Sequence, residues 1–151
     1  MKTILAAVDL SNSTGRVVHA GVRLARASGA RLDIIHVIPP PAIVMNDVYA
    51  VDATLAARIV DAANRYATRR LQALARRCRA RGVDVRIVQL DGDPLSRILK
   101  EAADRKPECV VIGSHGHTAA YDLLVGSVAH GLLRKAGCPV LVVPSGRRRR
   151  R

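Results

Sequence analysis

The sequence predicts a doubly wound α/β domain in which a five-stranded parallel sheet carries helices on both faces. Short apolar runs alternate with longer amphipathic segments along the 151 residues, most connections are short, and no internal repeat interrupts the order. Alternating strands and helices are joined by right-handed crossovers, which place the helices on the faces of a parallel sheet. We therefore expect one domain over residues 1–146, followed by a basic disordered tail over residues 147–151.

The first half of the chain supplies two strands and two helices. Residues 3–8 (TILAAV) form a continuous apolar run that is typical of a strand buried on both faces, and residues 31–38 (RLDIIHVI) form the second strand. Between them, LSNSTG offers several N-cap residues for an amphipathic helix that ends at Gly29. A long helix is expected over residues 54–81, where Gly82 stops it.

The second half of the chain continues the alternation. Residues 83–90 alternate apolar and polar side chains, as an edge strand does. Asp93 as N-cap and Pro94 at the first helical position predict the start of the next helix. The last three elements are expected at 109–113 (strand), 127–136 (helix) and 140–143 (strand). The resulting order, βαβαβαβαβ, is that of a Rossmann-like domain.

The composition excludes several classes of function. Hydrophobic residues make up 49% of the chain, and the core must be aliphatic because there is no Phe or Trp and only three Tyr. Base stacking on aromatic rings is therefore not expected. No apolar run approaches the roughly 20 residues that cross a bilayer, and no signal peptide is recognisable, which predicts a cytoplasmic protein. The three cysteines lack metal-ligand spacing and are expected to be reduced core or surface residues.

Positive charge is the second compositional feature. The net charge is +13, and five of these charges come from the terminal run Arg147–Arg151. A solvated tail is the expected state of that run, and a tether to nucleic acid or an anionic membrane is the alternative. The second half of the long helix carries six arginines that are expected to form a solvated face: Arg69, Arg70, Arg76, Arg77, Arg79 and Arg81.

The stretch GSHGHTAAYDLLVGSV (113–128) holds two glycines three apart, nine residues without glycine, and then a Gly-Ser pair. It follows an apolar strand, so Gly113 is expected at the edge of the sheet where ligands bind. Glycine lets backbone N–H groups approach an oxyanion, and Gly126-Ser127 opens a helix whose positive end attracts phosphate. The stretch lacks the Lys of GxxxxGK[ST] and the spacing of GxGxxG. It therefore predicts a phosphate site of another kind.

Other polar residues fall at or near the same edge of the sheet. Asp9 follows the first strand and is either a ligand-binding residue or only a helix N-cap; the glycine loop favours ligand binding. His115 and His117 lack a third metal ligand of definite spacing and are expected to be solvated, with His115 near phosphate. No Ser-His-Asp set, carboxylate pair or general base can be assigned. A binding switch is thus favoured over an enzyme, with hydrolysis or autophosphorylation slow and incidental.

These pieces resemble the universal stress protein family over essentially the whole chain. ILAAVDLS is similar to the opening strand of that family, CPVLVVP to its closing strand, and GxxG-x9-G(S/T) to the motif of its ATP-binding subset. The resemblance implies an ATP-binding regulatory protein of the stress response, with Mg²⁺ or Mn²⁺ bridging the phosphates. It also implies a homodimer formed through residues 140–143. The nucleotide would order residues 39–53 and the glycine loop to present a surface to a regulatory protein.

The resemblance also implies roles for individual residues. Adenine and ribose would lie against the end of the first strand, adenine also against the main chain of Val37, and ribose also against Ile112 and Gly113. The phosphates would lie against the rest of the glycine loop and the start of the last helix. The implied ligand-binding residues are Ala7, Val8, Asp9, Val37, Ile112, Gly113, His115, Gly116, Gly126, Ser127 and Val128. Ala129 stands where the family often has Ser or Thr, so one phosphate contact would be missing. The alternative is a nucleotide-independent interaction protein of the same fold, tethered to polyanions by its Arg tail.

Overall fold

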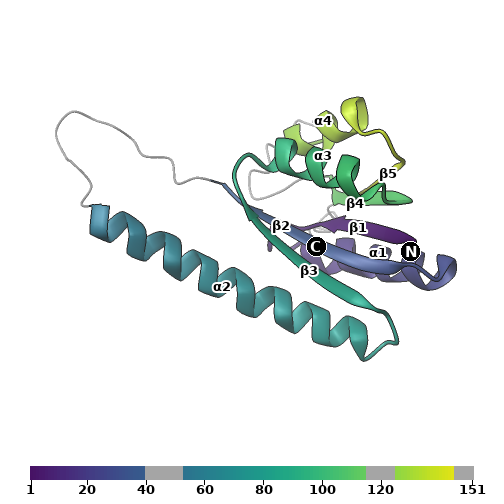
Figure 1. Cartoon of the computed structure of the whole chain (residues 1–151), viewed down its shortest axis with the longest axis horizontal. Helices are drawn as coiled ribbons and strands as arrows, with labels where there is room; N and C mark the ends of the chain where they lie inside the picture. The colour runs from purple at the N-terminus through teal and green to yellow at the C-terminus, as the bar shows by residue number, and fades with distance from the viewer. Residues whose placement is uncertain (40–52, 115–124, 145–151) are drawn as a thin grey trace, which may run out of the picture.

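The computed structural model describes residues 1–39, 53–114 and 125–144, and it has the predicted doubly wound α/β architecture (Figure 1). Five parallel strands form one sheet in the order β3-β2-β1-β4-β5, so β3 is an edge strand, as expected for residues 83–90, and β5 is the other edge strand. The tail at 147–151 lies outside the described residues. The elements are β1 (Thr3–Ala7), α1 (Thr14–Ser28), β2 (Arg31–Ile38), α2 (Ala53–Arg79), β3 (Val85–Asp91), α3 (Pro94–Arg105), β4 (Cys109–Gly113), α4 (Ser127–Lys135) and β5 (Val140–Val143).

The predicted helix signals act as expected at two helix ends. Gly29 ends α1 in the left-handed conformation at φ 65°, which glycine adopts without a Cβ penalty, and its N–H donates to the carbonyl of Ala25. Asp93 caps α3 by accepting a 2.8 Å hydrogen bond from the Ser96 backbone N–H, and Pro94 is the first helical residue. That bond, together with one from the Ser96 hydroxyl, lowers the pKa of Asp93.

Element boundaries differ from the predicted ones by at most two residues, and the largest differences lie around Gly82. The helix α2 ends at Arg79 because the chain turns there, with the Gly82 N–H donating to the Arg79 carbonyl at 2.9 Å. Gly82 adopts φ +73°, and Val83 N–H returns to the Cys78 carbonyl at 3.3 Å. This turn uses the residues expected to begin the strand, so β3 starts only at Val85.

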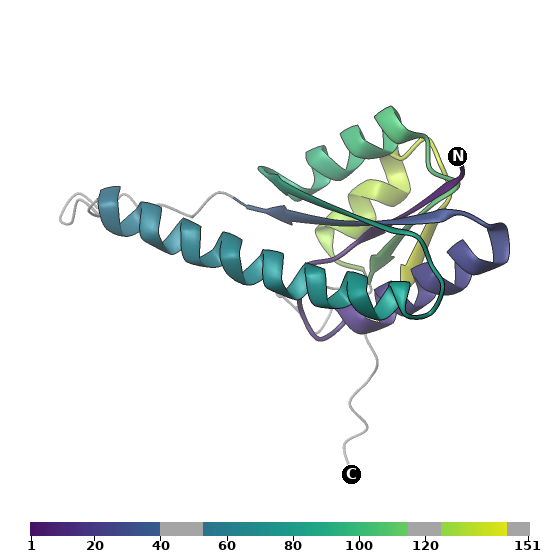
Figure 2. The ribbon, with the colours of Figure 1, turned by 60° about the horizontal axis from the view of Figure 1, so that its bottom comes forward.

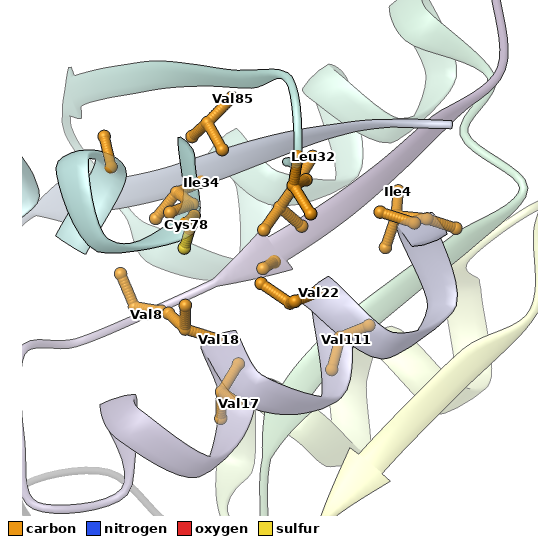
Figure 3. Packing of buried hydrophobic residues seen from close by; sticks show 14 of the residues in the cluster. Ile4, Val8, Val17, Val18, Val22, Leu32, Ile34, Cys78, Val85 and Val111 are labelled. Atoms are coloured by element: carbon orange, nitrogen blue, oxygen red, sulfur yellow. The ribbon is translucent and has the colours of Figure 1, made fainter. Parts of the chain in front are cut away.

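The four helices form one layer on each face of the sheet. Figure 2 shows α1 and α2 together on one face and α3 and α4 on the other. Each face has its own aliphatic cluster. Residues of β1 and β2 alternate between the clusters: Ile4 and Leu32 pack under α1 and α2, whereas Leu5 and Ile35 pack under α3 and α4 (Figure 3 shows the α1–α2 side). The alternation explains why most positions of these two strands are apolar on both faces, with Thr3, Arg31, Asp33 and His36 as the exceptions.

Close packing of α1 on the sheet depends on Gly21. A Cβ placed on Gly21 would lie 2.9 Å from Leu32 Cδ1 and 3.4 Å from the Ala6 Cβ, and Leu32 is fully buried. We expect Gly21→Val to lower the free energy of unfolding by about 1–3 kcal/mol, because overpacking forces shifts in a core without free space. Gly15→Val in the same helix is the matched control, since a Cβ there meets nothing within 4 Å. Equal losses in urea unfolding of both variants would contradict the packing role of Gly21.

The longest helix, α2, extends beyond the sheet. It contains 27 residues, and its first turns pass the ends of the strands, whereas its last turns cover β2 and β3 (Figures 1 and 2). Ala67, Leu71, Ala75 and Cys78 are its buried residues. Arginines interrupt its apolar positions throughout, and no helix within the described ranges is long and apolar enough to span a bilayer.

The three cysteines are free thiols, in agreement with the prediction from their spacing. Cys78 is a buried residue of α2, and Cys109 and Cys138 are partly buried. Burial raises the pKa of each thiol. Cys78 and Cys109 pack in or against the aliphatic cluster on the α1–α2 side of the sheet, and Cys138 packs against the cluster on the α3–α4 side.

Candidate functional site

A cavity of about 700 Å³ opens at the carboxyl ends of β1, β2 and β4. The chain winds from β1 through β2 to β3 in one direction and returns to β4 and β5 on the other side of β1. The boundary between β1 and β4 is therefore the switch point of the sheet, where doubly wound folds bind ligands. We call this space the switch-point cavity. Its lining residues are Ala7, Val8, Asp9, Leu10, Ser13, Val17, Ile35, His36, Val37, Ile38, Pro39, Ala63, Tyr66, Ala67, Pro94, Ile98, Ile112, Gly113, Ser114, Gly126, Ser127, Val128 and Ala129.

Asp9 belongs to a turn that leads from β1 to α1. Its Oδ1 accepts a 3.0 Å hydrogen bond from the Ser11 backbone N–H, and the Ser11 hydroxyl lies 2.9 Å from that of Ser13. Leu10 in the same turn has φ 62°, a conformation that costs energy for a side chain of this size. The N-cap of α1 is Ser13, so the alternative role of Asp9 as the N-cap is wrong. Asp9 instead stabilises the turn and lines the cavity.

The main chain of Val37 lies just beyond the point where β1 and β2 stop pairing. The last bond between them runs from Val8 N–H to the Ile35 carbonyl at 2.9 Å. Along a parallel strand, alternate residues direct their backbone polar groups to opposite neighbours. Ile38 accepts from Gly92 beside β3 at 3.0 Å, so Val37, like Ile35, faces the side of β1. Val37 therefore presents a backbone donor and acceptor at the cavity.

The end of β4 and the start of α4 are bonded directly to each other. The Gly126 N–H donates to the Ser114 carbonyl at 2.6 Å, and the Ser114 N–H donates to the Val143 carbonyl at 2.8 Å. These bonds join β4, β5 and α4, although ten residues separate Ser114 from Val125 along the chain. The Gly113 and Gly126 ends of the glycine motif are therefore neighbours at one side of the cavity.

The amino terminus of α4 supplies the polar end of the cavity. Gly126 is its N-cap and makes no side-chain capping bond, and the first turn contains no acidic residue. The N–H groups of Ser127, Val128 and Ala129 have no carbonyl partner one turn earlier within the helix, and the helix dipole is positive there. Four successive residues of this terminus, from Gly126 to Ala129, line the cavity. Such an arrangement favours a phosphate or another anion.

The opposite wall of the cavity is apolar. It is formed by the ends of β1, β2 and β4 and by the side of α2, with Val8, Val37 and Ile112 almost fully buried. The cavity has the volume of a typical small-molecule site and combines this wall with one anion-binding end. A ligand with a flat, weakly polar ring and a negatively charged group would fit both parts.

The structure brings most of the sequence-predicted site residues together. Nine of the eleven line the cavity, and His115 and Gly116 lie outside the described residues. Whether these nine bind a nucleotide stays a prediction. Within the described ranges, no group of three His, Cys, Asp or Glu side chains is placed to hold a metal ion, and His117 lies outside them.

Several lining residues were missed by the sequence reasoning. Tyr66 comes from α2, and periodicity alone could not show that this helix reaches the cavity. His36 lies on β2 with its Nδ1 2.8 Å from the carbonyl oxygen of Val8. His36 is a polar residue near the end of a largely apolar strand, and this position could have identified it as a residue of the site. Pro94 and Ile98 enter from α3 because that helix packs beside α4.

Comparisons with known proteins agree on one family. A model of the universal stress protein family matches residues 1–144. The universal stress protein in the QAH/OAS sulfhydrylase 3′ region of Thermus aquaticus is 30% identical over 148 residues, covering 94% of this chain and 98% of its own. Universal stress protein A homolog 1 of Coxiella burnetii is 29% identical over 143 residues, covering 94% and 95%.

Solved structures share the fold. A universal stress family protein from Burkholderia pseudomallei superposes with a TM-score of 0.74 at 29% identity, over 95% of this chain and 96% of that one. UspA from Lactobacillus plantarum superposes with a TM-score of 0.82 at 20% identity, over 94% of this chain and 97% of that one. A universal stress protein in complex with cAMP superposes with a TM-score of 0.69 at 25% identity, over 96% of this chain and 98% of that one. The chain belongs to the universal stress protein family.

Proposed function

We propose that this chain binds an adenine nucleotide, ATP, in the switch-point cavity and acts as a nucleotide-dependent regulatory switch in the stress response. One observation carries the proposal: the apolar wall at the strand ends and the amino terminus of α4 line the same cavity. The adenine ring suits the wall, and the phosphates suit the helix terminus. The complex of a related protein with cAMP supports the same class of ligand.

Each part of the nucleotide has a chemical counterpart among the lining residues. The backbone N–H and carbonyl of Val37 match the donor and acceptor on the edge of adenine. The Asp9 carboxylate accepts hydrogen bonds from ribose hydroxyls, as acidic residues do in other doubly wound nucleotide sites. Ile112 and Gly113 line the ribose, and Gly126, Ser127 and Val128 hold the phosphates. His115 and Gly116 complete the predicted set on the phosphate side.

A Mg²⁺ or Mn²⁺ ion would be held chiefly by the phosphates of the nucleotide and by water. The described residues contain no cluster of three metal-ligating side chains that could hold an ion alone. Mg²⁺ commonly binds in this way, with one or two protein carboxylates and several waters. Of the lining residues, Asp9 is the carboxylate able to contribute. The function is binding and signalling, with any hydrolysis or autophosphorylation slow.

The regulatory unit is proposed to be a cytoplasmic homodimer formed through β5. This strand is at the edge of the sheet, and Leu141 on it is 39% exposed, which is unusual for a leucine in a strand. β5 is also bonded to the end of β4 beside the cavity, through Ser114 and Val143. We infer that nucleotide binding is transmitted to the dimer surface through the pairing of β4 with β5, and that a regulatory protein recognises the resulting change in that surface.

The direct test is whether the protein carries a nucleotide. Protein purified without added nucleotide is denatured, and the released small molecules are separated by ion-exchange chromatography. Release of adenine nucleotide supports the proposal. No release, together with no binding of added ATP, ADP or AMP, would reject it and favour the nucleotide-independent interaction protein tethered by Arg147–Arg151.

Ala129→Ser is expected to strengthen ATP binding. Ala129 is the third residue of α4, is 2% exposed and lines the cavity, so its hydroxyl variant adds a donor beside the phosphates. A hydrogen bond to a charged group contributes about 1.5 kcal/mol, or on the order of tenfold in affinity. Calorimetric titration should show this gain for ATP and none for adenosine. A gain for both ligands, or for neither, would contradict the phosphate contact.

A further inference from the structure

The outward side of the α1–α2 layer concentrates positive charge. The two helices contain ten arginines, all exposed, and one acidic residue, Asp61. On the opposite face, α3 and α4 contain five basic and two acidic residues. The arginines of the α1–α2 layer are Arg16, Arg23, Arg26, Arg58, Arg65, Arg69, Arg70, Arg76, Arg77 and Arg79. Arg79 donates a 2.7 Å hydrogen bond to the Val85 carbonyl of β3, and we call the surface formed by the other nine the arginine face.

Four of these residues form a straight stripe along α2. Arg58, Arg65, Arg69 and Arg76 are separated by seven, four and seven residues, which places them on one side of a helix with 3.6 residues per turn. That side is opposite the buried residues, such as Leu71. At 1.5 Å per residue, the stripe is about 27 Å long. Positive charge is therefore arranged in a line rather than gathered around one point.

Ion pairing within the fold does not account for the arginine face. Within the described ranges, every ion pair lies elsewhere, and none includes an arginine of α1 or α2. By contrast, α3 pairs its charges internally through Lys100–Asp104 and Arg105–Glu101. The helix dipole favours basic residues only in the last turn of α2. Like charges four residues apart, such as Arg65 and Arg69, destabilise a helix.

We propose that the arginine face binds the phosphate backbone of double-helical nucleic acid without sequence preference. A linear set of guanidinium groups matches a linear polyanion, and arginine pairs with phosphate through two parallel hydrogen bonds. The four lysines of the chain all lie off these helices. Tyr66 is the only tyrosine among the described residues, and the Cζ atom of Arg70 lies 5.9 Å from the centre of its ring. Few aromatic rings are therefore available to stack on bases. Backbone contact alone gives affinity without base recognition.

This surface is distinct from the switch-point cavity. The residues of α2 that line the cavity are Ala63, Tyr66 and Ala67, and none of the ten arginines is among the lining residues. The stripe also differs from the terminal run Arg147–Arg151, which lies outside the described residues. Nucleic-acid binding can therefore be tested independently of nucleotide binding and of the tail.

The experiment measures anisotropy of a labelled DNA duplex of about 24 base pairs, roughly twice the length of α2, as full-length protein is added. The stripe variant replaces Arg65, Arg69 and Arg76 with glutamine. A matched control removes the same charge from other exposed positions, through Lys106→Gln, Arg134→Gln and Lys135→Gln. A third protein lacks residues 147–151. Circular dichroism verifies that each variant is folded.

The wild-type protein should bind the duplex with an affinity that falls as salt rises. Each lost phosphate contact reduces the slope of log K against log salt by about 0.9, so the stripe variant should lose about 2.7 in slope. Its affinity at about 0.1 M salt should fall at least tenfold, on the order expected for three contacts. The control should stay within about twofold of wild type, because its positions are off the face. The protein that lacks residues 147–151 should still bind the duplex through the stripe.

Several results would overturn the proposal. Wild-type protein that does not bind the duplex, or a stripe variant that binds like the control, would show that the arginine face is only solvated. Loss of all duplex binding on deletion of residues 147–151 would assign the affinity to the tail. Binding to phosphatidylserine vesicles that depends on the stripe, without binding to the duplex, would identify the partner as a membrane surface.

Discussion

Ser127→Asp is expected to weaken ATP binding by about 100-fold, because a fixed carboxylate would repel phosphates at the start of α4. Ser127 is the first residue of the helix and lines the cavity. The same carboxylate interacts favourably with the helix dipole, so the fold should be kept or slightly stabilised. Calorimetric titration with ATP measures the affinity, and thermal unfolding verifies the fold.

Two comparisons make the Ser127→Asp result specific to charge. Ser127→Asn has the same shape without the charge and should lose only a few-fold in affinity, since one hydroxyl donor is replaced by an amide donor. Adenosine has no phosphate, so its affinity should be nearly the same for all three proteins. Equal weakening of ATP by Asp and Asn, or equal weakening of ATP and adenosine by Asp, would contradict phosphate binding at α4.

Asp33→Ala is expected to lower the free energy of unfolding by about 3 kcal/mol, because it removes the buried carboxylate that pairs with Arg31 and leaves Arg105 with Glu101 as its remaining partner. Asp33 is 0% exposed on β2 and lies 2.7 Å from Arg31 Nε and 3.2 Å from Arg105 Nη1. It therefore joins β2 to α3. The hydrogen bond from Arg31 to Asp33 also raises the pKa of that guanidinium. Urea unfolding measures the loss.

The control for Asp33→Ala is Asp104→Ala. Asp104 pairs with Lys100 at 2.6 Å on the exposed side of α3, where water screens the charges. Its removal should cost less than about 0.5 kcal/mol, as exposed pairs four residues apart on a helix do. Similar losses for the two alanine variants would show that burial of Asp33 adds nothing to its ion pairs.

The fold could be predicted because its signals are local. Apolar runs, the glycine at position 29 and the Asp93-Pro94 pair each define an element from neighbouring residues, and the structure confirms them. The buried Asp33 was not predicted, because its partner Arg105 is 72 residues away in sequence. An aspartate between apolar residues, two positions after an arginine, was the available signal.

The grouping of most of the candidate site residues could also be predicted from the sequence, and the reason is the topology of the sheet. Parallel strands end at one edge of the sheet, so residues after strand ends meet even when they are distant in sequence, as Asp9, Val37 and Gly113 do. The contribution of α2 was missed because it depends on how that helix approaches the cavity. The hydrogen bond between Gly126 and Ser114 was also not predicted, because the number of residues between them does not show how far apart they lie in space.

The arginine face illustrates the limit of reasoning from a single helix. Taken alone, the arginines of α2 resemble an ordinary solvated surface. The structure places α1 on the same face of the sheet, and α1 adds three more arginines and no acidic residue (Figure 2). Ion pairs gather on the other layer, through α3. The difference in charge between the two helix layers arises because the crossover connections determine on which face of the sheet each helix lies.

Calorimetric titration of nucleotide-free protein with ATP, alongside adenosine, tests the central claim most directly. One ATP per chain should bind, and adenosine should bind at least tenfold more weakly, because the helix terminus contacts only the phosphates. The switch-point cavity would then unite a base-binding wall with a phosphate-binding end, as proposed. No heat of binding with ATP, or equal affinity for ATP and adenosine, would contradict that account.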